Sequence, residues 1–146
     1  MSSDLEKISS FIANHHVMSL ATTYKDELSV CSLFYVYDAL SKTFVVASSE
    51  ETTHIEHIKY NASIAGNILL ETKKIGEIKG LQFRGNFSQL DDAKLKLHYY
   101  KAFPYALAMN PTLWKIEVEF LKYTDNVLGF GKKLVWERTT SSKVFL

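Results

Sequence analysis

The residues best suited to bind a ligand lie between positions 45 and 61, where the sequence reads VVASSEETTHIEHIKYN. A strand-like apolar run ends in hydroxyl side chains, and a helical period follows. Thr53 and Glu56 have capping-box spacing, which predicts that Thr53 caps a helix ending near Asn61. Amides at a helix N-terminus and neighbouring hydroxyls form a seat for a phosphate. The predicted donors are Ser48, Ser49, Thr52, Thr53 and His54.

The same stretch has a purely structural interpretation. In it, Thr53 caps its own helix and the other hydroxyls form a polar loop. Glu50 and Glu51 favour this interpretation, because two carboxylates beside a phosphate dianion raise the electrostatic energy unless they point away. The sequence alone leaves both interpretations open.

Other reactive side chains give no catalytic pattern. His54 and His57 have a helical i, i+3 spacing, but no third ligand lies at a readable distance, so no metal site is predicted. Cys31 lies in an apolar strand-like run, where a buried, inert thiol is the ordinary case. Arg84 suits an anion only if it faces a cleft. No residue is assigned as nucleophile, general acid or general base.

Composition limits the class of protein. A chain of 146 residues with 47% apolar content predicts one domain over residues 1–146. The net charge is +1 and the charges are dispersed, so we expect no nucleic-acid partner and no anionic-membrane surface. A single cysteine excludes an internal disulfide and suits a reducing compartment. Since no apolar run approaches 18 residues and no leader is recognisable, the expected location is cytoplasmic.

The pattern of apolar residues predicts a mainly β protein. Leu5, Ile8, Phe11 and Ile12 share one face of an N-terminal helix. Three antiparallel strands are expected between residues 17 and 47, with further strands in 62–72, 77–90 and 113–125. Residues 126–138 are expected to form a bulged turn at Gly129 and Gly131 that leads to one last strand. A third helix is expected in 91–103. Six or seven strands without a strand–helix–strand rhythm predict an antiparallel sheet closed into a small barrel, with helices packed outside.

The order of elements and three segments resemble the pyridoxamine-phosphate-oxidase-like flavin-binding split barrels. The segments read LATTYKDELSVCSLFYVYDALSKTFVVASSEETTHIEHIKYNASIAG, IKGLQFRGNFSQL and WKIEVEFLKYTDN, and the ending YTDNVLGFGKKLVW is similar to that of the bacterial YhbP-like branch. The resemblance implies a six-stranded split barrel and a homodimer with two flavin mononucleotide (FMN) sites in its interface. It also implies an oxidoreductase with a small-molecule substrate or electron donor.

The resemblance also suggests roles for individual residues. The turn SSEETTH matches the phosphate-binding turn of the family, and the strand SLFYV matches the one that lines the isoalloxazine ring. The implied ring-side residues are Leu33, Phe34 and Tyr35. Many relatives carry lysine where this chain has His54, and Gln82 stands where a basic residue is common. Lys132 and Trp136 are expected to reach over the flavin of a partner subunit.

Three alternatives remain open at this stage. The protein is a non-catalytic flavin-binding or sensing module, a tetrapyrrole binder, or a structural dimer that has lost its cofactor. Tetrapyrrole-binding split barrels often use a histidine near the C-terminal end, and the ending VWERTTSSKVFL has none. His15 and His16 are the residues to test for that function.

Overall fold

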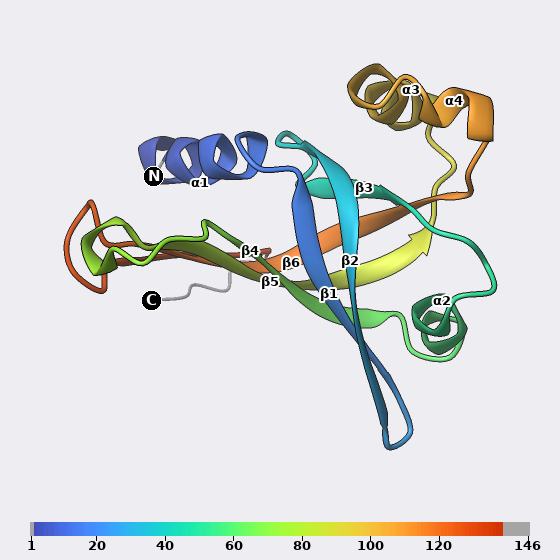
Figure 1. Ribbon diagram of the computed structural model, residues 1–146, viewed down its shortest axis with the longest axis horizontal. Helices are drawn as coiled ribbons and strands as arrows, with labels where there is room; N and C mark the ends of the chain where they lie inside the picture. Colours follow the sequence, from blue (N-terminus) through green and yellow to red (C-terminus); the bar gives the residue numbers. More distant parts are fainter. Residues whose placement is uncertain (1, 139–146) are drawn as a thin grey trace.

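The computed structural model describes residues 2–138, which form one antiparallel sheet with helices around it (Figure 1). The strands are β1 (Val17–Tyr24), β2 (Glu27–Asp38), β3 (Thr43–Ala47), β4 (Ser63–Leu69), β5 (Lys79–Gln89), β6 (Leu113–Asp125) and β7 (Lys133–Glu137). The helices are α1 (Ser2–Ala13), α2 (Thr53–Ile58), α3 (Ala93–Ala102) and α4 (Ala106–Met109), with a 3₁₀ turn η1 (Ile75–Glu77). The predicted mainly β architecture is confirmed.

The sheet closes on itself as a barrel. Its strand order is β3-β2-β1-β4-β5-β6-β7, and an additional pairing of β3 with β6 joins the two sides. The described residues form seven strands, one more than the six that the resemblance implies and within the six or seven that the alternation predicts. One edge of the long β6 pairs with β3 over residues 113–117 and with β7 over 120–124. Six strands therefore close the ring, and the seventh extends the sheet beyond it.

The barrel interior is built from alternate strand residues. Met18 and Leu20 of β1 and Ile116 and Val118 of β6 are fully buried, whereas their chain neighbours face outward. Helix α1 covers one end of this core. Ile8, Phe11 and Ile12 of α1 are buried, as the sequence predicts. The Tyr35 hydroxyl donates to the Ile12 carbonyl at 2.6 Å and ties α1 to β2.

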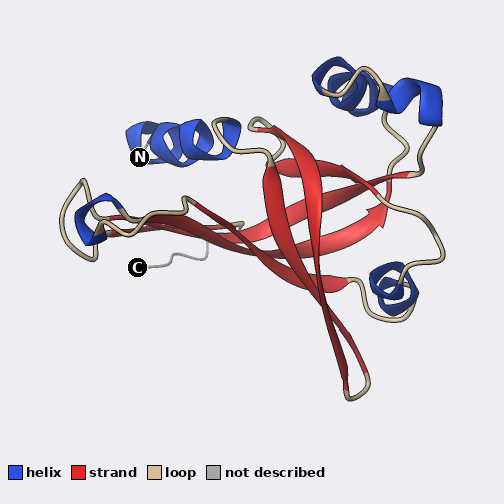
Figure 2. Cartoon of the chain, viewed as in Figure 1, coloured by secondary structure: helices blue, strands red, loops and turns tan. Residues whose placement is uncertain are grey.

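Helices α3 and α4 cover the outside of β2 and β3 (Figure 2). Asp92 caps α3, since its carboxylate accepts from the Lys94 and Leu95 amides, and Tyr99 packs with Val36 and Val45. The predicted helix over 91–103 is confirmed. Helix α4 was not predicted, because four residues are too few to show a helical period.

Two loops extend from the barrel as an arm, defined here as residues 70–79 and 125–133. The Asn126 side-chain amide donates to the Ile75 carbonyl at 2.8 Å and holds the loops together. Gly131 has φ +72°, a left-handed conformation that suits glycine, so the predicted glycine turn before the last strand is confirmed. The arm carries Lys132.

Candidate functional site

Strand β2 is longer than its partner β3, which leaves part of one edge open. β2 pairs with β1 over residues 27–34 but with β3 only over 35–38. The Tyr35 amide donates to the His16 carbonyl at 3.0 Å, on the β1 side. Backbone groups alternate between the two edges, so those of Val30, Ser32 and Phe34 point to the other edge. No strand of the described chain pairs there, and we call residues 28–34 the open edge.

The three predicted ring-side residues differ in where their side chains and backbone groups point. Phe34 points outward and is 54% exposed, with its ring 5.6 Å from that of Phe103. Leu33 packs against the core, and Tyr35 is buried. The backbone groups of Leu33 and Tyr35 also face β1. Val30 and Ser32, which the sequence reasoning did not select, therefore share the open edge with Phe34. The period of two along the strand is the signal that selects them.

The predicted phosphate residues lie where β3 leaves β2. Residues 48–52, the serine turn, lead from the end of β3 into α2. His54 Nε2 lies 2.5 Å from Ser48 Oγ and 3.3 Å from Thr52 Oγ1, which brings these three predicted residues together. The Trp114 indole donates to the Ser48 carbonyl at 2.9 Å and fixes the start of the turn.

The helix cap differs from the prediction by one residue. Thr52, not Thr53, caps α2, because its hydroxyl accepts from the Ile55 amide at 3.4 Å. Thr53 is the first helical residue and is exposed. The predicted cap at Thr53 and helix end near Asn61 are wrong, since α2 ends at Ile58. The Ser49 hydroxyl donates to the Glu51 carboxylate instead of facing a ligand.

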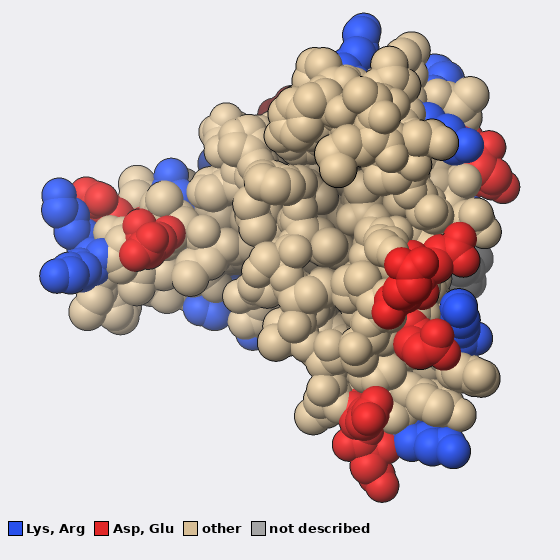
Figure 3. Space-filling model, turned by 45° about the vertical axis from the view of Figure 1, so that its right-hand side comes forward, with Lys and Arg blue, Asp and Glu red and all other residues tan. Residues whose placement is uncertain are grey.

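The surroundings of the serine turn are acidic. A hollow of about 680 Å³, the serine hollow, is lined by Ser48, Ser49, Glu50 and Glu51 together with residues 109–112. Acidic side chains gather along this side of the molecule (Figure 3). Burial, and secondarily the neighbouring His57, lower the pKa of His54. His54 is therefore neutral at neutral pH and adds no fixed positive charge.

His57 ties α2 to the β1–β2 hairpin. Its Nε2 lies 3.0 Å from Glu27 Oε1 and its Nδ1 lies 2.9 Å from Thr22 Oγ1. A carboxylate only accepts, so Nε2 donates to Glu27, and Nδ1 shares a hydrogen bond with the threonine hydroxyl. Within residues 2–138, no group of three His, Cys, Asp or Glu side chains lies close enough to hold a metal ion.

A second hollow, the histidine hollow, borders the Phe34 end of the open edge. Its volume is about 540 Å³. It brings together histidines from distant segments, which are His15 and His16 after α1 and His98 on α3. Their convergence follows from the packing of α1 and α3 beside β2, which no local pattern reveals.

Gln82 lies on the outer face of β5, apart from the serine turn. It lines a hollow of about 360 Å³ with Ser19, Ala21, Ala65 and other outward residues of β1, β2, β4 and β6. The β1 and β4 residues that line this hollow are small, whereas β5 contributes the longer polar side chains of Gln82 and Arg84. The Arg84 guanidinium lies 4.0 Å from the centre of the Phe120 ring, a cation–π contact that holds it against the face.

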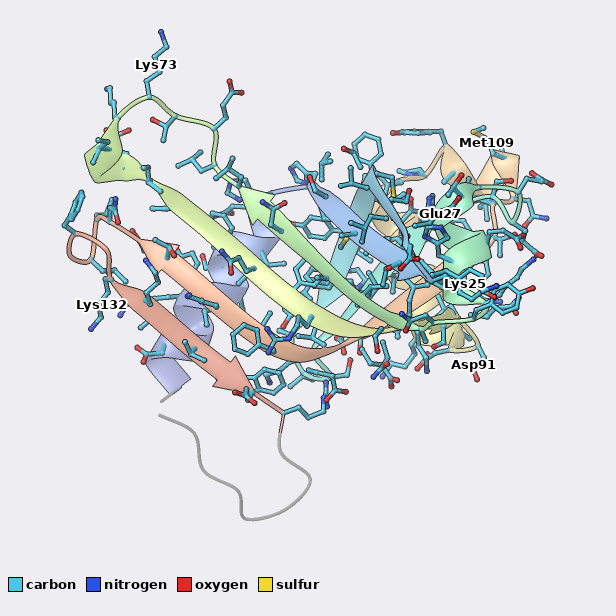
Figure 4. The ribbon with its side chains drawn as sticks, turned by 90° about the horizontal axis from the view of Figure 1, so that it is seen from below. Lys25, Glu27, Lys73, Asp91, Met109 and Lys132 are labelled. Carbon is cyan, nitrogen blue, oxygen red and sulfur yellow. The ribbon has the colours of Figure 1, made fainter. Side chains whose placement is uncertain are left out.

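Lys132 is distant from the serine turn within one chain. Figure 4 shows Lys132 on the arm at the opposite end of the molecule from Met109, which lines the serine hollow.

Cys31 is half-buried in β2, and burial raises the pKa of its thiol, which disfavours a nucleophilic thiolate. No helix in residues 2–138 has the length and apolar character to cross a membrane.

Curated proteins similar to this chain are bacterial. It is 34% identical over 142 residues to a UPF0306 protein of Klebsiella pneumoniae, covering 95% of this chain and 97% of the relative. It is 35% identical over 137 residues to the UPF0306 protein YhbP of Escherichia coli O127:H6, covering 92% and 98%. No family model matches the chain.

Solved structures share the fold at low identity. A heme binding protein from Mycobacterium smegmatis has a TM-score of 0.74 and 14% identity, covering 92% of this chain and 57% of that one. An FAD-binding protein from Mesorhizobium loti gives 0.67 and 15%, covering 81% and 91%. A pyridoxinephosphate oxidase family protein from Clostridium acetobutylicum gives 0.68 and 14%, covering 94% and 96%. The fold is thus the pyridoxamine-phosphate-oxidase-like split barrel, as the resemblance implies.

Proposed function

The chain belongs to the UPF0306 family and folds as a split barrel, and from these two facts we propose that it binds FMN and acts as an oxidoreductase on a small molecule. The observation that carries the proposal is the open edge of β2 beside the serine turn. Flavin presents ring carbonyls, nitrogens and one N–H, and the backbone groups of Val30, Ser32 and Phe34 supply matching donors and acceptors.

The donors at the serine turn fit a phosphate in type, although not in charge. Ser48, Thr52 and His54 already form one connected hydrogen-bonded group that a phosphate can join. Thr53 adds an exposed hydroxyl. No Lys or Arg lines the serine hollow among the described residues. The seat therefore works through neutral donors, and a monophosphate suits it better than a more highly charged group.

A second copy of the chain covers the outer face in this proposal. The β1 and β4 residues that line the hollow on this face are small, such as Ser19, Ala21 and Ala65, and β1 adjoins the open edge, so an isologous dimer buries them beside the ring. Gln82 then lies at the interface. Lys132 reaches a flavin only from the partner's arm, since it is distant from the serine turn of its own chain.

Bound flavin supplies hydride or one-electron transfer. The protein positions the ring on β2, stacks Phe34 against it or against a substrate, and holds the phosphate end through Ser48 and His54. No described side chain is assigned a proton-transfer role.

Purification without added cofactor tests the proposal. We expect a yellow protein that releases FMN on denaturation, with affinity reduced at least tenfold in Ser48→Ala and His54→Ala and unchanged in Lys73→Ala on the arm. Anaerobic bleaching by reduced nicotinamide cofactor supports a reductase, and no bleaching with any donor supports a non-catalytic module. A colourless protein that refuses added FMN contradicts the proposal.

Haem binding is the second candidate, favoured by the three histidines of the histidine hollow. We rank flavin first because the open edge offers backbone hydrogen bonds that a tetrapyrrole ring cannot use. A Soret band on titration with haemin that disappears in the His15→Ala His16→Ala variant would reverse this order.

A further inference from the structure

The histidine hollow has a lining rich in aromatic side chains. Five of its lining side chains are aromatic rings from β2 and α3–α4, namely Phe34, Tyr35, Tyr37, Phe103 and Tyr105. Phe34 is 54% exposed and Tyr105 is 69% exposed, so the fold itself leaves these two rings uncovered. Exposed rings around a concave surface favour a planar apolar ligand that stacks on them.

His15 is held in one orientation at the wall of this hollow. Its Nδ1 lies 2.9 Å from the Phe11 carbonyl oxygen, and its ring centre lies 4.2 Å from that of Phe11. A carbonyl only accepts, so Nδ1 carries a hydrogen. The neutral ring then has an acceptor at Nε2, and the protonated ring has a second donor there. The contacts with Phe11 fix the ring before any ligand arrives.

The charges around the hollow admit an anion. Among the described residues that line it, none is Asp, Glu, Lys or Arg, and the groups that can become positive are His15, His16 and His98. Burial, reinforced by the Asp38 carboxylate, raises the pKa of Tyr37 to about 12, so this phenol stays neutral. An anionic group next to the imidazoles therefore meets no lining carboxylate, and at His15 it meets a donor at Nε2 on the protonated ring, since Nδ1 already donates to Phe11.

We propose that the histidine hollow binds a small aromatic carboxylate, with its ring among Phe34, Phe103 and Tyr105 and its carboxylate at His15 and His98. The volume of about 540 Å³ falls within the ordinary range of small-ligand sites. Because the hollow borders Phe34, such a ligand lies next to a ring bound at the open edge. Its role as substrate rests on the proposed flavin function, whereas its binding does not.

Calorimetric titration with matched probes tests this site. The probes are 2-naphthoate, the neutral 2-naphthalenemethanol and the non-aromatic cyclohexanecarboxylate. We expect naphthoate to bind at least tenfold more tightly than either other probe. His15→Gln and His98→Gln should each weaken naphthoate about tenfold and leave the alcohol unchanged, since they remove an imidazole from different elements. Lys73→Gln on the arm is the matched control.

Several results would overturn the proposal. If the alcohol binds as tightly as naphthoate, the hollow recognises only the apolar ring and not the carboxylate. If naphthoate binding is unchanged in both histidine variants, the imidazoles do not contact the carboxylate. Haemin that displaces naphthoate and gives a His15-dependent Soret band would assign the hollow to a tetrapyrrole. If thermal melting shows that His15→Gln is unfolded, His98→Gln decides, because α3 carries His98 at the exposed surface.

Parallel titrations separate this proposal from the flavin function. Each probe is titrated into protein with and without FMN. Histidine-dependent naphthoate binding by a protein that refuses FMN supports the hollow and contradicts the flavin function. Normal FMN binding without any naphthoate binding up to millimolar concentration supports the flavin function and overturns the assignment of the hollow.

Discussion

The two ends of the open edge of β2 differ in charge and in the use of histidine. At the Glu27 end, α2 and Glu51 at the end of the serine turn carry carboxylates, and the histidines of α2, His54 and His57, are buried and hydrogen-bonded within the protein. At the Phe34 end, the histidine hollow has no lining carboxylate among the described residues, and His16 and His98 are exposed. The same strand therefore separates an acidic region from one that accepts anions.

This difference shows that a histidine's role depends on which groups already occupy its ring nitrogens. His57 has both nitrogens engaged, by Thr22 and Glu27, so it serves the structure. His15 has Nδ1 engaged by the Phe11 carbonyl, and its Nε2 remains for a ligand. A phosphate at the acidic end must rely on neutral donors, whereas an anion at the other end meets imidazoles and no lining carboxylate among the described residues.

The largest effect that separates the two regions is on stability. His57→Ala should lower the free energy of unfolding by about 3 kcal/mol, because it opens a cavity and leaves the buried Thr22 hydroxyl without its partner. His98→Ala, at the exposed surface of α3, should change it by less than about 0.5 kcal/mol. Urea unfolding measures both. If both variants lose a similar free energy of unfolding, His57 and His98 do not differ in their structural role, and the distinction between structural and ligand-facing histidines is wrong.

Phe34 is the residue that the two regions share. Phe34→Ala should weaken FMN, riboflavin and 2-naphthoate by about tenfold each, since the lost stacking contact serves the flavin ring and the neighbouring ligand alike. Phe130→Ala is the control, because Phe130 is 81% exposed on the distant arm. Calorimetry gives all three affinities. A loss confined to one ligand would mean that the regions do not meet at Phe34.

The sequence predicts the fold well because its signals are local. Alternation identifies the strands, the Asp92 cap locates α3, and the resemblance supplies the split barrel. The last strand, β7, is predicted from the sequence, but no local pattern tells whether it joins the ring or extends the sheet at β6. The one-residue error at Thr53 has a similar cause. Both Thr52 and Thr53 can cap a helix. In the structure Thr52 is the cap, and the next residue but one, His54, contacts Ser48 at the start of the turn.

The site is only partly predictable from the sequence. Ser48, Thr52 and His54 are adjacent in the chain and come together as expected. The side chains of Leu33 and Tyr35 face the interior. Side chains alternate along a strand, so only Phe34 of the three points outward. The histidine hollow joins segments more than 80 residues apart, from His16 to His98, and only packing brings them together.

A smaller effect tests the acidic surroundings of the serine turn. The Glu50→Gln Glu51→Gln variant should bind FMN about threefold to tenfold more tightly at low salt, because two negative charges near the phosphate are removed. Riboflavin lacks the phosphate, so its affinity should not change. Titrations of both flavins at two salt concentrations measure the effect. Equal tightening of riboflavin would show that the carboxylates do not act on a phosphate.

The smallest effect concerns the pH dependence of stability at His54. Burial, with a lesser contribution from His57, lowers the pKa of His54 in the folded state below its unfolded value of 6.5. As the pH falls through 6.5, the unfolded chain takes up a proton before the folded chain does, so the free energy of unfolding falls until the folded pKa is reached. His54→Gln should remove this component between pH 7.5 and 5.5, while Lys73→Gln should keep it. Urea unfolding at several pH values measures the slope, and an unchanged slope in His54→Gln would mean that the buried ring does not resist protonation.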